Sequence, residues 1–207
     1  MAMDLDANPV IETILMAHTK ALDNAAMEQV RAHLGAFLNT HPNPAFAEGP
    51  TFIQESFEIF ELPASAISAA AMNPRGTAEF LRRTGRWHHQ ITQKGVAVGI
   101  AHSGAAHTFH GGWTIHSVFA SQLAARVARA IEKIDRDRPD EDLEAIYVTI
   151  PAYKIVCFLL RGYSSEEVFV VSSASTAQGA EEGKFYPARD FLNSLLQRQQ
   201  IRGLLVR

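Results

Sequence analysis

Apolar side chains recur at helical spacing in the first forty residues. The Asn8-Pro9 pair is a favourable helix start, and Asp23 is a favourable cap for a further helical stretch. The pattern therefore predicts an N-terminal helical segment over 1–40. It leaves open whether residues 8–39 form one bent helix or two.

A proline-rich run at 41–50 predicts a linker, and the spacing of apolar positions changes repeatedly after it. The pattern predicts, in chain order, a strand at 51–62, helices at 64–72 and 73–83, hairpin strands at 86–93 and 96–102, a long amphipathic helix at 114–136, strands at 143–150, 153–161 and 168–172, and a last helix from Pro187. Strands joined by hairpins, with helices between them, indicate an α+β domain over 51–207. Its sheet is expected to be mainly antiparallel, with five to six strands flanked by helices.

From residue 64 onward, this predicted order of elements resembles that of the roadblock and profilin-like folds. The resemblance lies in element order and in no shared motif. It implies a domain that acts in binding and assembly, although a fold by itself does not carry a function.

The turn at Lys94-Gly95 determines which histidines share a face of the predicted hairpin. With a two- or four-residue loop, His89 shares a face with His102, and the two apolar faces of the strands coincide, which favours this register. A three-residue loop with Gly95 in a bulge instead puts His88 on that face. Lysine is unfavourable at a turn position of positive φ, so the second register stays open.

Composition and charge narrow the class of protein. The chain has 207 residues, 47% of them hydrophobic, which is typical of a globular protein that buries its own core. The net charge of −3 argues against a nucleic-acid binder, and no run approaches the roughly 18 apolar residues that a membrane span needs. Cys157 is the only cysteine, so an internal disulfide is impossible and a reducing, cytoplasmic location is expected.

Candidate chemistry is concentrated between Trp87 and His116, which holds six of the nine histidines. Imidazole side chains bind zinc, nickel or copper, so a divalent metal is a candidate cofactor. The candidate metal ligands are His102, His107, His110 and His116. The motifs HExxH and paired CxxC are both absent, and no acid lies between Glu79 and Glu132 to act as a general base, which weakens the case for a metal enzyme.

The same stretch predicts a ligand-binding wall. Its candidate members are Trp87, His89, His102, Ser103, Gly104, Gly111, Gly112 and Trp113. The glycine-rich loop precedes the predicted helix at 114–136, and helix N-terminal amides favour a small anionic ligand. No catalytic residue is assigned, because the GxSxG pattern is absent around Ser103.

The sequence therefore favours a non-enzymatic module that recognises a partner protein or a small ligand and that forms a homodimer. Two alternatives stay open. One is a metal-dependent hydrolase that uses the histidines from His102 to His116, and the other is an anion or nucleotide sensor that uses the loop from Gly104 to Gly112.

Overall fold

The described part of the chain is built around one mixed β-sheet. The computed structural model describes residues 21–73, 76–106, 112–139, 142–174 and 180–205, with side chains described up to residue 198. The strands are β1 (Phe52–Glu61), β2 (Arg82–Gln93), β3 (Val96–Ala105), β4 (Trp113–Ala120), β5 (Glu144–Ile150), β6 (Ile155–Arg161), β7 (Glu166–Ser173) and β8 (Phe185–Pro187), in the spatial order β4-β3-β2-β1-β5-β6-β7-β8. All neighbouring pairs are antiparallel except β1 and β5, which are parallel.

The α+β class is confirmed, but the predicted sheet of five to six mainly antiparallel strands is wrong. The sheet has eight strands and contains a parallel pair. Two strands were not predicted: β4 lies inside the expected helix at 114–136, and β8 is only three residues long. The parallel pair arises because α3 (Gln122–Asp137) crosses the sheet and delivers β5 beside β1.

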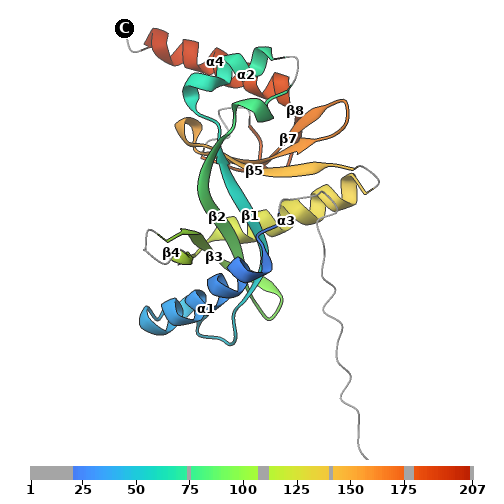
Figure 1. Cartoon of the computed structure of the whole chain (residues 1–207). Helices are drawn as coiled ribbons and strands as arrows, with labels where there is room; N and C mark the ends of the chain where they lie inside the picture. Colours follow the sequence, from blue (N-terminus) through green and yellow to red (C-terminus); the bar gives the residue numbers. More distant parts are fainter. Residues whose placement is uncertain (1–20, 74–75, 107–111, 140–141, 175–179, 206–207) are drawn as a thin grey trace, which may run out of the picture.

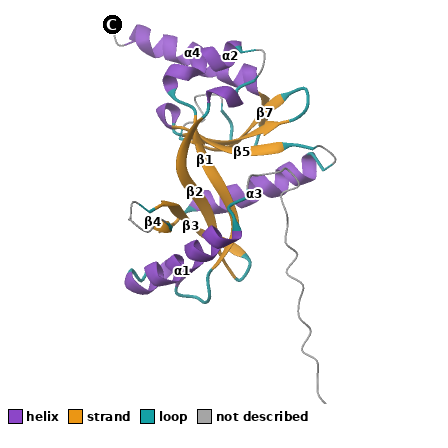
Figure 2. Cartoon of the chain, in the orientation of Figure 1, coloured by secondary structure: helices purple, strands orange, loops and turns teal. Residues whose placement is uncertain are grey.

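The helices cover both faces of the sheet (Figures 1 and 2). On one face, α3 buries Val127, Ile131 and Ile134 against side chains of β1 and β5–β7. On the other face, α2 (Ile67–Met72) and α4 (Ala188–Leu205) pack against β5–β7. The predicted helix at 73–83 is wrong, because the chain makes only a 3-10 turn at Ala78–Phe80 before β2 begins.

Helix α1 (Asn24–Thr40) covers the β2–β4 part of the face that α2 and α4 share. The predicted cap is confirmed, since the Asp23 side chain accepts a hydrogen bond from the Ala26 amide at 2.8 Å. Val30 and Leu34 of α1 are buried against the sheet. Residues 21–23 are described and are not helical, so one continuous helix over 8–39 is wrong. The Asn8-Pro9 helix start lies outside the described residues, and it stays a prediction, like the division at residue 40. Among the described helices, none combines the length and apolar character needed to cross a membrane.

Candidate functional site

The β2–β3 hairpin brings His88, not His89, opposite His102. The loop has two residues, Lys94 and Gly95, with φ values of 51° and 76°. Further along the hairpin, β3 contains one extra residue, so Thr92 pairs with Ala97 but the preceding residue pairs with Gly99. This bulge shifts the parity of the rest of the hairpin by one residue.

The favoured register, with His89 and His102 on one face, is therefore wrong. His88 and His102 face α3, whereas His89 faces α1. No pattern of residues indicates the bulge, which forms where Gly99 packs against the Phe46 ring. A Cβ atom at Gly99 would lie only 2.5 Å from that ring.

His89 forms a buried hydrogen-bonded group with two serines. Its Nε2 lies 2.6 Å from Ser103 Oγ, and its Nδ1 lies 2.8 Å from Ser56 Oγ. A nucleophile, a base and an orienting group have this layout in serine hydrolases. Here, however, His89 and Ser103 are fully buried, the third member is a hydroxyl, and burial followed by the charge of His102 lowers the pKa of His89 to about 4. The group satisfies polar atoms of His89 and Ser103, whose side chains are closed to solvent in this structure.

His88 is the second buried histidine. Neither of its ring nitrogens has a hydrogen-bond partner among the described residues, and its ring packs 4.8 Å from Tyr147 and 5.6 Å from His102 between ring centroids. Burial, then the charges of His102 and His89, hold its pKa well below the usual value. His88 is therefore a neutral ring in the core.

The proposed metal ligands do not come together in the part of the chain that is described. His107 and His110 lie outside the described residues. His102 is half-buried on β3, and burial, then Arg86 and His116, lower its pKa to about 4. Among residues with a described position, no group of three or more His, Cys, Asp or Glu side chains is arranged to hold a metal ion.

The other members of the predicted ligand wall differ in burial. Trp87 is buried beneath α1 and meets the half-buried Trp113 edge to face, with ring centroids 6.2 Å apart. Gly104 is buried beside His116, and Gly111 is outside the described residues. Gly112 leads into strand β4, not into a helix. The helix start expected directly after this loop is therefore wrong, whereas anion binding by the loop itself stays a prediction.

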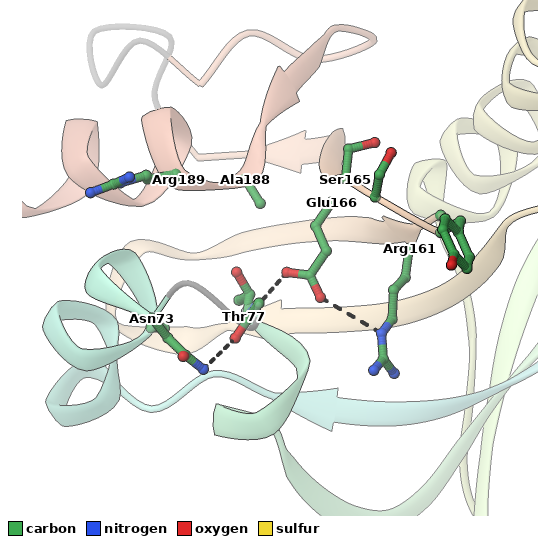
Figure 3. A pocket seen from close by; sticks show the side chains of 12 residues that line it. Asn73, Thr77, Arg161, Ser165, Glu166, Ala188 and Arg189 are labelled. Carbon is green, nitrogen blue, oxygen red and sulfur yellow. Dashed lines mark hydrogen bonds and ion pairs between the residues drawn. The ribbon is translucent and has the colours of Figure 1, made fainter.

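An open pocket lies at the far end of the molecule, between α2, the β6–β7 turn and the start of α4 (Figure 3). Its volume is about 410 Å³. We call it the Glu166 pocket. Its lining is Ala70, Asn73, Gly76, Thr77, Arg161, Gly162, Tyr163, Ser164, Ser165, Glu166, Ala188 and Arg189.

The Glu166 carboxylate fixes the geometry of this pocket. One oxygen accepts a hydrogen bond from the Thr77 backbone amide, and the other lies 3.9 Å from Arg161 Nε. Gly76 makes the first contact possible, because its φ is 112° and a Cβ atom there would lie 2.6 Å from the carboxylate. Arg161 also donates to Glu144 at 3.2 Å, so its charge is shared between two carboxylates.

The rim of the Glu166 pocket is polar and accessible. Ser164, Ser165 and Arg189 are exposed, and the Arg189 side chain extends away from Glu166 (Figure 3). Tyr163 is fully exposed at 107% of its reference area. The described lining contains two arginines and one carboxylate, and it contains no histidine or cysteine. Among its described residues, no hydroxyl group is recorded in a hydrogen bond to a base.

Sequence reasoning missed this pocket because its two sides are far apart in the chain. Residues 73–77 read as a cap and a helix start, and residues 161–166 read as an ordinary turn. The packing of α2 beside α4 brings the two segments together. The one available signal was Tyr163, a large aromatic side chain in a Gly-Tyr-Ser-Ser turn.

Comparison with known proteins gives no name to this arrangement. No family model, curated protein or solved structure matches the chain. No matching solved structure therefore supports the resemblance in element order to the roadblock and profilin-like folds.

Proposed function

We propose that the protein is a non-enzymatic binding module of the cytoplasm, and that the Glu166 pocket holds a small anionic ligand. The observation that carries the proposal is an open, polar pocket whose lining contains two arginines and one carboxylate. Guanidinium groups bind carboxylates and phosphates through charge-assisted hydrogen bonds. The exposed Tyr163 ring adds a flat surface for an apolar or planar part of the ligand.

The burial of the other candidate groups supports a binding role. His88, His89 and Ser103 are fully buried, and Cys157 is buried with its thiol pKa raised to about 12 by desolvation. A buried thiol of raised pKa is a poor nucleophile. It is also in keeping with a reducing compartment such as the cytoplasm, where a lone cysteine stays unpaired.

Anion binding is tested by variants on the rim of the Glu166 pocket. Phosphate, pyrophosphate, citrate and nucleotides are screened by thermal shift, and a hit is measured by calorimetry. Arg189→Ala should weaken binding by about tenfold, since one charge-assisted hydrogen bond is lost. Arg189 is exposed, so the change should leave folding intact.

The matched control is Arg129→Ala, which removes an exposed arginine from α3 on the opposite face of the sheet. It should leave both melting and anion affinity unchanged. Tyr163→Ala should weaken only ligands that carry a planar group. A screen in which no anion raises the melting temperature would contradict the proposal, as would equal losses in Arg129→Ala and Arg189→Ala.

The proposal also includes a homodimer. Its support is strand β4, which lies at one edge of the sheet and carries no charged side chain among its eight residues. An edge strand of this kind is a ready template for pairing with another chain. Light scattering of the purified chain tests this part separately from anion binding.

A further inference from the structure

The two edges of the sheet differ in how they are protected. One edge is β8, which has three residues and ends in Pro187. A short edge strand and a proline are both devices that prevent edge-to-edge pairing. The other edge is β4, Trp113–Ala120, with eight residues and no Lys, Arg, Asp, Glu or Pro. Only β8 therefore carries the usual protection.

Strand β4 pairs with β3 along its whole length on its inner side. It pairs with β3 from Trp113 opposite Ala105 to Ala120 opposite Gly99, with one irregularity next to His116. In an antiparallel strand, about half of the backbone groups point away from the neighbour. At the beginning of β4, the Trp113 amide donates to Gln29 of α1 at 2.9 Å. That end of the edge is thus covered by α1.

The other end of β4 is the accessible one. His116, Phe119 and Ala120 are exposed, and Phe119 retains 37% of its surface. Ser117 to Ala120 pair regularly with β3, so this stretch presents a straight edge. The edge continues into Val96, which is 62% exposed where β3 begins.

We infer that β4 pairs antiparallel with β4 of a second copy of this chain, about a two-fold axis within Ser117–Phe119. This inference rests on the homodimer part of the proposed function and names its surface. The pairing would join the two eight-stranded sheets edge to edge.

The choice of a second copy follows from self-complementarity. A strand related to itself by a two-fold axis meets its own donors and acceptors in antiparallel order. Residues at and beside the axis lie close to their own copies, so a charge there would repel its copy. The sequence WTIHSVFA contains none, and Phe119 would gain an apolar neighbour.

The test is the oligomeric state of the intact chain and of two edge variants. By light scattering, the wild type should be a dimer at micromolar concentration. Ala120→Lys and Phe119→Lys should each raise the dissociation constant of the dimer by about tenfold or more, because a lysine on an edge strand opposes pairing with another strand. Ala120 is exposed, so its variant tests pairing even if loss of the Phe119–His102 ring contact affects folding.

Phe52→Lys is the matched control. Phe52 is 60% exposed on β1, an interior strand of the sheet, so its variant should remain a dimer. Hydrogen exchange gives a second readout: amides of Ser117–Ala120 should be more protected as the protein concentration rises.

The outcomes distinguish the homodimer itself from its proposed surface on β4. A monomeric wild type overturns both the homodimer and the β4 pairing. A dimer that survives Ala120→Lys and Phe119→Lys, with no concentration-dependent protection in β4, keeps the homodimer and overturns this surface. Anion binding at the Glu166 pocket is expected to be the same in the monomeric variants.

Discussion

His88 lies in a row of rings that crosses the sheet beneath α3. From β4 inward, the row contains Phe119, His102 and His88, followed by Phe57 and Tyr147. Successive centroids are between 4.8 and 6.2 Å apart. A ring with two unpaired nitrogens in such a row is costly to bury, and protonating it there would cost more. The row is therefore sensitive to acid.

The buried histidines predict a loss of stability on acidification. An unfolded histidine takes up a proton below its ordinary pKa of 6.5, whereas folded His89 and His102 stay neutral down to a pKa of about 4. The unfolded state thus binds more protons between these values. The contribution of these histidines to the free energy of unfolding should level off above pH 6.5 and should fall as the pH decreases from about 6.5 to 4.

His88→Phe tests the contribution of one ring. With one histidine fewer to protonate on unfolding, the loss of stability per pH unit below pH 6 should be smaller by up to about 1.4 kcal/mol. The measurement is urea unfolding at pH 7, 6, 5 and 4.5. His33→Phe replaces an exposed histidine of α1 as the control. Parallel pH profiles for wild type and His88→Phe would show that His88 protonates equally in both states.

At the scale of an element, the β2–β3 hairpin shows how one turn and one bulge act together. The turn requires positive φ at both Lys94 and Gly95, and asparagine or aspartate is the favoured first residue in such turns. The charge of Lys94 contributes little to stability, because its ion pair with Glu48 is 3.9 Å long and both side chains are over 70% exposed. The native turn therefore carries strain that a substitution can relieve.

Lys94→Asn should stabilise the protein by about 0.5–1 kcal/mol, because asparagine tolerates the left-handed conformation better than lysine does. The urea midpoint of unfolding is the measurement. Lys94→Gln removes the same charge without this preference and should leave the midpoint nearly unchanged. If the Gln variant gains as much as the Asn variant, the effect comes from charge and not from the turn.

Strand β4 and helix α3 show the limit of periodicity. Ile115, Val118 and Phe119 fit helical spacing, so the expected helix began at Thr114. The true start is Gln122, where the Ser121 hydroxyl accepts a hydrogen bond from the Leu123 amide at 3.1 Å. β-Branched and aromatic residues also favour strands, and pairing with β3 decides the conformation here.

At the scale of the molecule, the sheet consists of two four-stranded halves with a narrow junction. β1 and β5 share two registered pairs, whereas β5 and β6 share seven. The halves are further joined by α3, which packs on β3 at its start and on β7 further along (Figure 1). The cooperativity of unfolding should therefore depend on α3.

Ile131→Ala on α3 tests this coupling. It should cost about 2–5 kcal/mol and separate the two halves on unfolding. Both tryptophans, Trp87 and Trp113, lie in the β1–β4 half, so their fluorescence reports that half while far-UV circular dichroism reports the whole chain. The two transitions should coincide in the wild type and differ in the variant.

Ile150→Ala is the control, since Ile150 is equally buried but packs on the α2–α4 side of the sheet. Its two transitions should shift together. Coincident transitions in Ile131→Ala would mean that the β1–β5 junction alone couples the halves.

The sequence by itself determined the α+β class, the cap of α1, strand β1, the position of the hairpin at Lys94-Gly95 and the strands β5–β7. All of these depend on side chains close together in the chain, through capping, turn chemistry and alternation. Tertiary structure alone decided the bulge that exchanges His88 for His89, the conversion of 113–120 into an edge strand, and the parallel β1–β5 pair. It also assembled the Glu166 pocket from segments about ninety residues apart. The physical reason is that strand pairing and helix packing join distant residues, whose contacts outweigh local preference and leave no periodic mark in the sequence.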